Sequence, residues 1–425
     1  MSRSWTLDTW LAHLEGLHPR GSAGIELGLE RVASVKSRLE QRETVPLILV
    51  AGTNGKGSTC ALLERILHSA GYRVGLYTSP HLLRYNERVR VAGQVADDAA
   101  LCAAFARVEA ARQETPLTYF EFGTLAAWEV FAAAAVDAVI LEVGLGGRLD
   151  ATNVYRPDCA IVTGVDLDHT DLLGADREAI GFEKAGIFRP AVPAICGDPR
   201  PPHSLLAHAA ALGAPLQFLG RDFGYLRQEQ QWLYWGPGGR RGGLAHPGLR
   251  GLNQLANAAC ALAALDALRE RLPVAMKDIR RGLLEAELPG RFQVLPGRPA
   301  VVLDVAHNPQ AARVLAANLG EMAFHPRTWA VFGMLADKDV DGVIDAMSER
   351  VTHWLPCTLE GRRGASADFL ASRLQQRGLN VAGCHVSARE ALAAAQEAAS
   401  EDDRILAFGS FLTVAAALQF LGRPA

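Results

Sequence analysis

The sequence has almost no excess charge of either sign. Its 425 residues include 43 Lys and Arg against 46 Asp and Glu, which gives a formal net charge of -3. A protein that binds nucleic acid mainly through its phosphates usually carries a basic face. The charge balance therefore argues against nucleic acid as a partner.

Long apolar segments are also missing. The alanine-rich run over residues 131–139 contains Asp137 and is too short to span a bilayer. The stretch from Met1 to Trp10 carries charges and lacks the apolar core of a signal peptide. We therefore expect no membrane partner and no secretory leader.

Cysteine pairs are absent as well. The seven cysteines are scattered, their number is odd, and no two form a Cys-x-x-Cys pair. This pattern is typical of reduced thiols, so a cytoplasmic location is expected. With 49% hydrophobic and 21% charged residues, the composition is that of an ordinary globular enzyme. The length exceeds that of one typical domain and predicts two domains or three.

The most informative stretch that is present covers residues 47–63. Leu47 to Ala51 predicts a buried strand, residues 58–69 predict a helix, and a glycine-rich turn joins them. In a phosphate-binding loop of this kind, backbone N–H groups and the positive end of the helix face the anion. The residues expected to bind the phosphates of a nucleotide are Thr53, Asn54, Gly55, Lys56, Gly57 and Ser58.

Within this loop, Lys56 would bring a positive charge to the phosphates, and Ser58 or Thr59 would offer a hydroxyl to Mg²⁺. The spacing departs from the usual Gly-x4-Gly-Lys-Ser/Thr pattern, because Val50 stands at the first glycine position and Gly57 separates Lys56 from Ser58. The alternative is a turn that needs glycine only for its geometry. Strand, lysine, hydroxyls and helix in register favour the phosphate loop.

Ser79, Glu142 and His169 each follow or end a predicted strand. The strand before Ser79, residues 73–78, is expected to lie beside the strand at 47–51. Ligands of open α/β sheets bind beyond the carboxyl ends of the strands. These side chains should therefore gather with the phosphate loop at one edge of the sheet.

Three of these ionisable residues allow alternatives. A carboxylate at a buried strand end is costly unless it is paired, so Glu142 either binds Mg²⁺ or forms a structural salt bridge. His169 either contacts metal or phosphate or is an ordinary core histidine. Lys184, among apolar residues of a helix predicted over 176–188, has either a lowered pKa or an anionic partner. Spacing alone does not decide which.

Strands and helices alternate through most of the chain. A helix is predicted over 25–39 with Arg31 and Lys36 on its outer face, and 84–94 is predicted to be an irregular loop. Residues 221–250 are turn-rich and alternate loosely, which predicts a small antiparallel excursion.

A second pattern of alternating strands and helices begins after a hinge, Leu-Pro-Gly-Arg-Phe, at residues 288–292. The fold class is therefore α/β, with a P-loop mononucleotide-binding domain over residues 1–287 and a smaller C-terminal Rossmann-like α/β domain over 288–425. The second domain has no glycine-rich loop and is expected to complete the first domain's site. Asp304 ends its first strand and could bond a ribose or cap the next helix, for which Asn308 already serves.

Together these residues resemble the folylpolyglutamate synthase family within the Mur ligase superfamily. The matching motifs are Gly-Thr-Asn-Gly-Lys-Gly-Ser (52–58), Tyr-Thr-Ser-Pro-His-Leu (77–82), Tyr-Phe-Glu-Phe-Gly-Thr (119–124), Glu-Val-Gly-Leu-Gly-Gly-Arg-Leu-Asp-Ala-Thr-Asn (142–153), Asp-His-Thr (168–170), Glu-Lys-Ala-Gly-Ile-Phe (183–188), Leu-Pro-Gly-Arg-Phe (288–292) and Asp-Val-Ala-His-Asn-Pro (304–309). They cover nearly the whole chain in order. Residues 117–122 resemble the bifunctional bacterial branch.

The resemblance implies an ATP-dependent amide ligase that adds L-glutamate to 7,8-dihydropteroate and to tetrahydrofolate through an acyl phosphate. It implies two Mg²⁺ ions, the first held by Ser79 and Glu142 and the second by His169. It also implies that Lys184 is carbamylated, and that Lys56, Lys184, His169 and Arg291 act in catalysis. Closure about Arg291 would exclude water, which hydrolyses acyl phosphates. Whether a monovalent cation is needed stays open.

The remaining contacts implied by the resemblance are of three kinds. Those to ATP come from Asn257, Arg291, Asp304 and His307. Those to the pterin come from Ile25, Glu26, Leu27, Gly28, Thr118, Tyr119, Phe120, Glu121, Leu149, Asp150 and Ala151. His307 and Ser410 are the candidates for binding glutamate.

Three alternative functions remain at this point. The chain could be a folylpolyglutamate synthase only, or a ligase that adds an amino acid to a cell-wall precursor. It could also be a nucleotide-driven switch without ligase chemistry, which would bind ATP but release no phosphate in response to glutamate. Because one pair of domains can hold the whole site, we expect a monomer.

Overall fold

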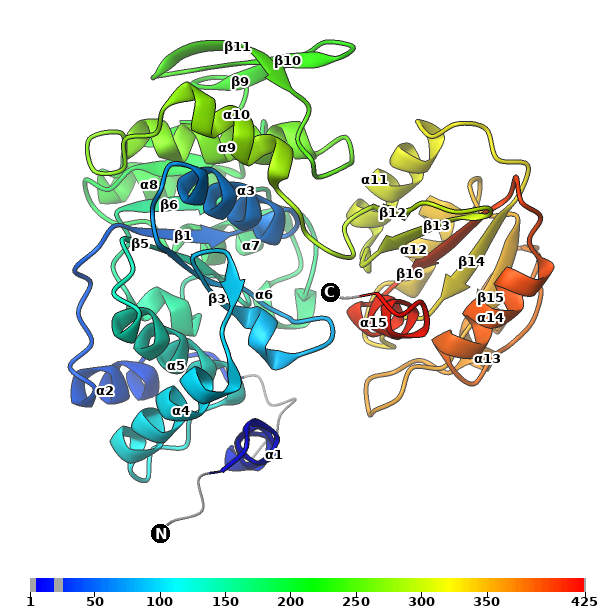
Figure 1. Ribbon diagram of the computed structural model, residues 1–425, viewed down its shortest axis with the longest axis horizontal. Helices are drawn as coiled ribbons and strands as arrows, with labels where there is room; N and C mark the ends of the chain where they lie inside the picture. The colour runs from blue at the N-terminus through cyan, green and yellow to red at the C-terminus, as the bar shows by residue number, and fades with distance from the viewer. Residues whose placement is uncertain (1–4, 19–25, 424–425) are drawn as a thin grey trace. The chain divides into compact units, whose positions relative to one another are not determined.

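The computed structural model describes residues 5–18 and 26–423, so Ile25 lies outside the described residues. The chain forms two compact units (Figure 1). One comprises residues 1–248 and 255–286, and the other comprises residues 249–254 and 287–425. The predicted domain border, after residue 287, lies one residue from the border between the two units after residue 286. The functions assigned to the two domains stay predictions.

The first unit is built on an eight-stranded sheet with the order β4-β3-β2-β5-β1-β6-β7-β8. All neighbours pair in parallel except β2 with β3 and β3 with β4. The strands are β1 (Leu47–Ala51), β2 (Val74–Tyr77), β3 (Val89–Val91), β4 (Gln94–Val95), β5 (Ala138–Glu142), β6 (Cys159–Val162), β7 (Ala194–Cys196) and β8 (Leu216–Phe218).

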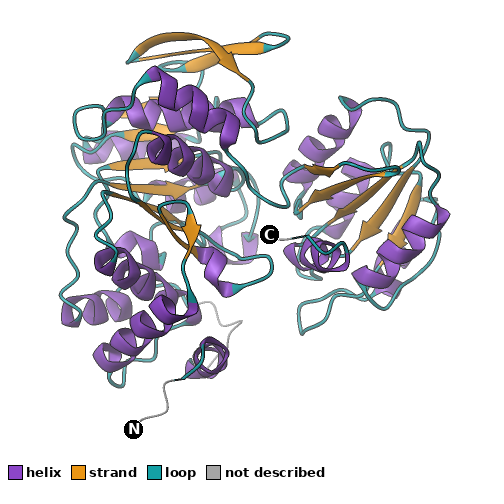
Figure 2. Cartoon of the chain, viewed as in Figure 1, coloured by secondary structure: helices purple, strands orange, loops and turns teal. Residues whose placement is uncertain are grey.

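Both faces of this sheet are covered by helices, as parallel sheets require (Figure 2). The helices are α1 (Leu7–Leu17), α2 (Glu30–Arg38), α3 (Lys56–Ser69), α4 (Asp98–Arg112), α5 (Tyr119–Ala133), α6 (Thr170–Leu173), α7 (Arg177–Ala185), α8 (His203–Leu212), α9 (Gln254–Ala267) and α10 (Met276–Glu285), with short 3-10 turns η1 (Tyr85–Arg88) and η2 (Ala151–Val154). Alternate residues of β1, namely Leu47, Leu49 and Ala51, join one core cluster with α1, α2, α4 and α5. Ile48 and Val50 are equally buried on the opposite face.

Helix α3, which follows the glycine loop, is fixed by α10. A Cβ added at Gly282 of α10 would lie 2.4 Å from the Cα of Ile66 on α3, so the two helices pack backbone against backbone. This close contact holds the helix whose first turn carries the candidate phosphate site.

A three-stranded antiparallel sheet of order β11-β10-β9 confirms the excursion predicted after residue 221. Its strands are β9 (Gly224–Arg227), β10 (Gln231–Gly236) and β11 (Gly239–Ala245). Within the described residues, no helix is both long and apolar enough to pass through a membrane.

The second unit has a five-stranded sheet of order β12-β13-β16-β14-β15, parallel except for β12. This arrangement confirms the predicted α/β fold class. Its strands are β12 (Gln293–Leu295), β13 (Ala300–Asp304), β14 (Thr328–Phe332), β15 (His353–Pro356) and β16 (Arg404–Phe408), and its helices are α11 (Pro309–Gly320), α12 (Val340–Met347), α13 (Ala367–Gln375), α14 (Ala388–Ala398) and α15 (Phe411–Phe420).

Several local predictions were wrong. Strand β2 does not lie beside β1, because β5 pairs with both of them. The helix predicted from residue 25 begins at Glu30. The predicted loop over 84–94 contains η1 and two strands of the sheet, β3 and the start of β4. Strand β12 was not predicted at all, because three residues carry too little pattern.

The side chain of Gln41 links three parts of the first unit. Its amide donates to Leu125 O at 3.0 Å and to Glu129 Oε1 at 2.7 Å, and its Oε1 accepts from the hydroxyl of Tyr155 at 2.6 Å. The Tyr155 ring in turn stacks on Trp128, with ring centroids 4.2 Å apart.

Replacing Gln41 with Leu is expected to lower the free energy of unfolding by about 2–3 kcal/mol, because it removes the bonds of Gln41 to a buried hydroxyl and a buried carboxylate. Urea unfolding followed by tryptophan fluorescence measures this change. Gln230→Leu, at an exposed position, is the control and should stay near wild type. Equal unfolding midpoints for Gln41→Leu and wild type would show that the network does not stabilise the unit.

Candidate nucleotide and substrate site

The glycine loop between β1 and α3 is held tightly against the segment that follows β6. Thr53 N donates to Gly164 O at 2.9 Å, and the hydroxyl of Thr163 donates to Asn54 O at 2.7 Å. A Cβ at Gly52, which has φ +148°, would lie only 1.9 Å from Thr163 Oγ1. Glycine is therefore required at this position.

The first turn of α3 has the features of an anion site. Gly55 is the N-cap with φ +88°, a backbone conformation that favours glycine. A 14-residue helix begins at Lys56, so the N–H groups of its first turn and the positive end of its dipole lie at the end of the loop. The side chain of Lys56 folds back over the loop, and its ammonium donates to Gly52 O at 3.0 Å. The lysine charge therefore lies beside the loop that precedes α3. These donors fit the phosphates of a nucleotide.

Asn257 of α9 lies over this loop. A Cβ at Gly55 would be 2.5 Å from Asn257 Oδ1, so the asparagine side chain occupies the space beside the N-cap. Asn257 is buried. Nothing in the spacing of residues 253–268 indicates this position, and it was named only through the family resemblance.

Ser79 and Glu142 are brought together at the ends of β2 and β5. Ser79 N donates to Glu142 Oε2 at 3.2 Å, and Glu142 pairs in register with Val50 of β1. Glu142 is only 4% exposed. The described residues contain no group of three or more His, Cys, Asp and Glu side chains able to hold a metal. The donors fit Mg²⁺, which in nucleotide sites takes one or two carboxylates and completes its shell with water and phosphate oxygens.

Lys184 of α7 is buried near other charged groups of the site. Burial lowers its pKa to about 7, with Lys56 adding to the effect, whereas Asp168 and Asp150 oppose it. The charges of Lys56 and Lys184 thus lie close enough to interact. The spacing of residues in the sequence could not show that these two lysines come together. A lysine with this pKa carries a substantial neutral fraction at pH 7.

His169 adopts an unusual backbone. It is the N-cap of α6 with φ +50°, and its N–H donates to Asp168 Oδ1 at 2.9 Å. A left-handed conformation at a non-glycine residue is uncommon and is often found at functional positions. The His169 Nε2 atom lies 3.9 Å from Asp168 Oδ1.

Two of the predicted pterin residues, Thr118 and Glu121, make hydrogen bonds that stabilise the start of α5. Thr118 and Glu121 form a capping box at the start of α5, in which Glu121 N donates to Thr118 Oγ1 at 3.2 Å and Thr118 N donates to Glu121 Oε2 at 2.7 Å. Arg31 Nη2 donates to Glu121 Oε1 at 2.9 Å, and Arg31 also pairs with Glu26.

Arg31 was predicted on the outer face of its helix, yet its side chain is only 21% exposed. The same holds for Lys36, which pairs with Glu43.

The other predicted pterin residues lie around the 144–151 turn. Phe120 packs directly on Gly144, where a Cβ would be 2.7 Å from its ring. Gly28 N donates to Leu149 O at 3.3 Å, which ties residues 26–28 to this turn. Asp150 accepts from Leu145 N at 2.9 Å and Thr152 N at 3.0 Å, and burial raises the pKa of its carboxyl.

A second cluster lies in the other unit. Asp304 accepts from Phe292 N at 2.8 Å and Ala306 N at 2.7 Å, and burial raises the pKa of its carboxyl although Arg291 opposes the shift. The Arg291 guanidinium lies 5.3 Å from the centre of the Phe411 ring, and the His307 ring lies 6.3 Å from it. Phe411 was not predicted as a site residue.

Two helix caps of the second unit involve residues that were considered in the sequence. Asp304 was predicted either to bond a ribose or to cap the helix that follows it. Asn308 Oδ1 accepts from Ala311 N at 2.9 Å and caps α11, so Asp304 is not the cap. The hydroxyl of Ser410, a candidate for glutamate binding, accepts from Leu412 N at 3.2 Å and caps α15.

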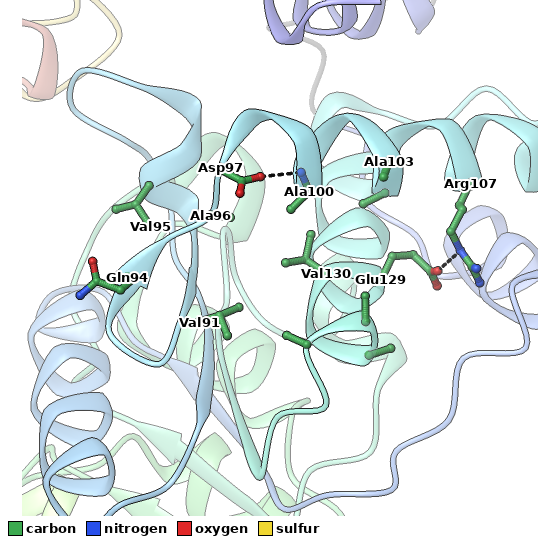
Figure 3. A pocket seen from close by; sticks show the side chains of 14 residues that line it. Val91, Gln94, Val95, Ala96, Asp97, Ala100, Ala103, Arg107, Glu129 and Val130 are labelled. Carbon is green, nitrogen blue, oxygen red and sulfur yellow. Dashed lines mark hydrogen bonds and ion pairs between the residues drawn. The ribbon is translucent and has the colours of Figure 1, made fainter. Parts of the chain in front are cut away.

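A pocket of about 680 Å³ lies elsewhere in the first unit, between the β3–β4 hairpin and helices α4 and α5 (Figure 3). It is lined mainly by alanine and valine, with the Arg107–Glu129 ion pair at one end. No predicted site residue lines it. The pocket is therefore separate from the nucleotide site.

Comparison with known proteins identifies the family of the chain. Residues 50–196 match the Mur ligase middle domain and residues 290–411 match the Mur ligase glutamate ligase domain. The chain is 46% identical to the dihydrofolate synthase/folylpolyglutamate synthase of Escherichia coli, over 98% of this chain and 95% of that protein. It is 41% identical to the Haemophilus influenzae protein of the same name, over 96% of each.

Solved structures give the same result. The structure of E. coli FolC in complex with DHPP and ADP has a TM-score of 0.93 at 46% identity and covers 99% of this chain and 98% of that one. The bifunctional folylpolyglutamate synthase/dihydrofolate synthase of Yersinia pestis has a TM-score of 0.90 at 47% identity, covering 99% of each. The chain thus belongs to the dihydrofolate synthase/folylpolyglutamate synthase family of Mur ligases.

Proposed function

We propose that this chain joins L-glutamate to 7,8-dihydropteroate and to tetrahydrofolate at the cost of ATP. The observation that carries the proposal is the glycine cradle with Lys56, set beside the Ser79–Glu142 pair at one edge of the sheet. Related structures have been solved with DHPP and ADP, and with Mn, AMPPNP and L-glutamate. The full-length likeness to bifunctional folate enzymes argues against a cell-wall ligase.

The reaction has two steps. A carboxylate oxygen of the pterin substrate attacks the γ-phosphorus of ATP, giving an acyl phosphate and ADP. The amino group of L-glutamate then attacks the acyl carbon, an amide forms, and inorganic phosphate leaves with the electron pair of the broken C–O bond while the amine loses a proton. Bound Mg²⁺ would neutralise charge on the transferring phosphoryl group.

The residues of this chain have separate roles in that reaction. The loop Thr53–Ser58 would hold the phosphates, with Lys56 stabilising the developing charge. Ser79 and Glu142 would hold one Mg²⁺, and His169 the other. Asn257, Arg291, Asp304 and His307 are assigned to the nucleotide, with His307 and Ser410 as candidates for glutamate. The described pterin residues are Glu26, Leu27, Gly28, Thr118, Tyr119, Phe120, Glu121, Leu149, Asp150 and Ala151.

Lys184 is assigned as the residue that reacts with CO₂. Only a neutral amine can form a carbamate, and the pKa of Lys184 near 7 supplies that form at neutral pH. The carbamate is an anion, so it replaces a buried cation beside Lys56 with an attractive partner.

The test is phosphate release from ATP with L-glutamate and either 7,8-dihydropteroate, tetrahydrofolate or no pterin. We expect release with both pterins, and products that are one glutamate heavier by mass spectrometry. Release with tetrahydrofolate alone would leave a folylpolyglutamate synthase. Release with neither would contradict the folate function, and glutamate-independent ATP binding alone would favour a nucleotide switch.

The protein is further proposed to act as a cytoplasmic monomer. Each half of the chain has its own core and sheet, and one copy carries every residue assigned above. Light scattering should give a mass near 45.6 kDa at all concentrations. A concentration-independent mass of twice that value would contradict the monomer.

A further inference from the structure

The segment that connects β2 to β3 is unusually well fixed for a loop. The carboxylate of Glu87 accepts from three successive backbone N–H groups, those of Leu82, Leu83 and Arg84, at 2.7, 2.8 and 2.6 Å. At its start, Ser79 N is bonded to Glu142. Backbone groups that are satisfied in this way hold the loop in one conformation.

This loop orients the imidazole of His81. Arg88 Nε donates to His81 Nδ1 at 2.8 Å. Arg88 is itself placed over two tyrosine rings, 5.4 Å from the centre of Tyr85 and 5.5 Å from that of Tyr119. Because an arginine cannot accept a hydrogen bond, Nδ1 must be the acceptor, and the ring proton is on Nε2.

The Nε2–H group of His81 is available for a ligand. Within the described residues, this half-buried ring accepts the bond from Arg88, contacts the Tyr85 ring with centroids 6.0 Å apart and interacts electrostatically with the Glu87 carboxylate. His81 thus presents a donor of fixed tautomer. It stands two residues after Ser79, and its partner Arg88 lies on Tyr119, one of the predicted pterin residues.

We propose that His81 donates a hydrogen bond from Nε2 to the reacting carboxylate of the pterin substrate, and that Arg88 positions His81 by fixing its tautomer. The proposal rests on the proposed function. A substrate with a pterin at one end and a carboxylate at the other must reach from the pterin residues to the metal end of the site. The loop carrying His81 is linked to both ends through Tyr119 and Ser79.

A neutral donor suits this carboxylate. A lysine or arginine at the same place would bind the carboxylate through a full charge and would withdraw electron density from the attacking oxygen. An imidazole N–H bonds one oxygen with less loss of nucleophilicity, and it leaves the other oxygen free to attack phosphorus. The Arg88 guanidinium interacts with His81 Nδ1 through a hydrogen bond and with the two tyrosine rings through cation–π contacts.

The experiment measures the dissociation constants of two pterins in the presence of ADP and Mg²⁺. One is 7,8-dihydropteroate, which carries the carboxylate, and the other is 6-hydroxymethyl-7,8-dihydropterin, which does not. The variants are His81→Asn, whose amide reaches only the Nδ1 position, and His81→Gln, whose amide N–H reaches the Nε2 position. Circular dichroism and ADP affinity verify that each variant is folded.

We expect His81→Asn to bind dihydropteroate about 10- to 100-fold more weakly, as for a lost hydrogen bond to a charged group, and His81→Gln to stay within about threefold. Binding of the hydroxymethylpterin should change in neither variant. Equal weakening for both pterins, or wild-type affinity of His81→Asn for dihydropteroate, would overturn the proposal.

Arg88→Met tests the positioning role, because methionine has no N–H group to donate to His81 Nδ1 and so leaves the imidazole tautomer unfixed. It should weaken dihydropteroate binding in the wild-type background but not in the His81→Gln background, because a glutamine amide has no tautomer to fix. The same loss in both backgrounds would overturn the role of Arg88. Failure of the wild-type protein to bind dihydropteroate is a different result, and it would contradict the proposed function together with this proposal.

Discussion

Lys184→Met is expected to reduce ligase turnover by about 10³-fold and at the same time to make the protein more stable. Lys184 is buried, its pKa is lowered to about 7, and Lys56 adds to that shift. Keeping a lysine here costs folding free energy, whereas methionine fills a similar volume without a charge. We expect a residue that destabilises the fold to be kept where the proposed chemistry needs it.

The gain in stability should depend on pH. The folded-state pKa near 7 lies below the ordinary lysine value of about 10.4. Between these values the unfolded chain binds more protons, so wild-type stability rises with pH. The advantage of Lys184→Met is therefore largest below pH 7 and shrinks as the pH rises from 7 to 10. Calorimetry in CO₂-free buffers should give a melting temperature raised by roughly 2–4 °C at pH 6 and by less at pH 9.

The control is Lys277→Met, the same substitution at an exposed position of α10. It should leave both turnover and melting temperature near wild type. If Lys184→Met kept its activity, the assigned catalytic role would be wrong. If its melting temperature fell, the buried amine would have to be stabilised in the folded protein rather than destabilised.

Local patterns predicted the phosphate loop well because its parts are contiguous. Strand β1 has the predicted bounds, Leu47–Ala51. The helix begins at Lys56 rather than at the predicted Ser58. The difference arises because Gly55 takes a left-handed conformation as N-cap and Gly57 continues the helix. Composition suggested that both glycines belonged to the turn.

Strand order could not be predicted from local pattern. The strands β1 and β2 flank one helix and look like a simple parallel pair, yet β5 pairs with both. A strand some 60 residues away in sequence can insert there because all three are uniformly buried and have no distinguishing polar face. The insertion places Glu142 beside Ser79, the pair that the proposed function assigns to Mg²⁺.

Charged residues around the candidate site were the hardest to identify from the sequence. Arg31, Glu87 and Arg88 have the composition of a solvated surface, but each makes specific bonds, to Glu121, to a run of backbone N–H groups and to His81. Asn257, in an alanine-rich helix, lies over Gly55 only after folding. Such long-range pairs leave no periodic signal, so only the structure or a family resemblance can indicate them.

Glu142→Gln is expected to lower kcat/KM by about 10²- to 10³-fold. The substitution keeps the size of the side chain, and a glutamine Oε1 can still accept the hydrogen bond from Ser79 N, which is 3.2 Å from the carboxylate in the native protein. What is lost is the negative charge at the end of β5, and with it a ligand for Mg²⁺. Titration with Mn²⁺ in the presence of ADP should show weaker metal binding, whereas ADP binding without metal should be unchanged.

Glu64→Gln is the matched control for that experiment. Glu64 is also 4% exposed, burial raises its pKa while Arg90 opposes the shift, and it lies on α3, the helix that begins at the phosphate loop. Its neutralisation should leave metal binding and turnover near wild type. If both variants lost activity equally, the loss would come from neutralising any buried carboxylate near α3. If Glu142→Gln alone lost activity but bound Mn²⁺ normally, Glu142 would act by orienting the Ser79 loop, and the metal would need other ligands.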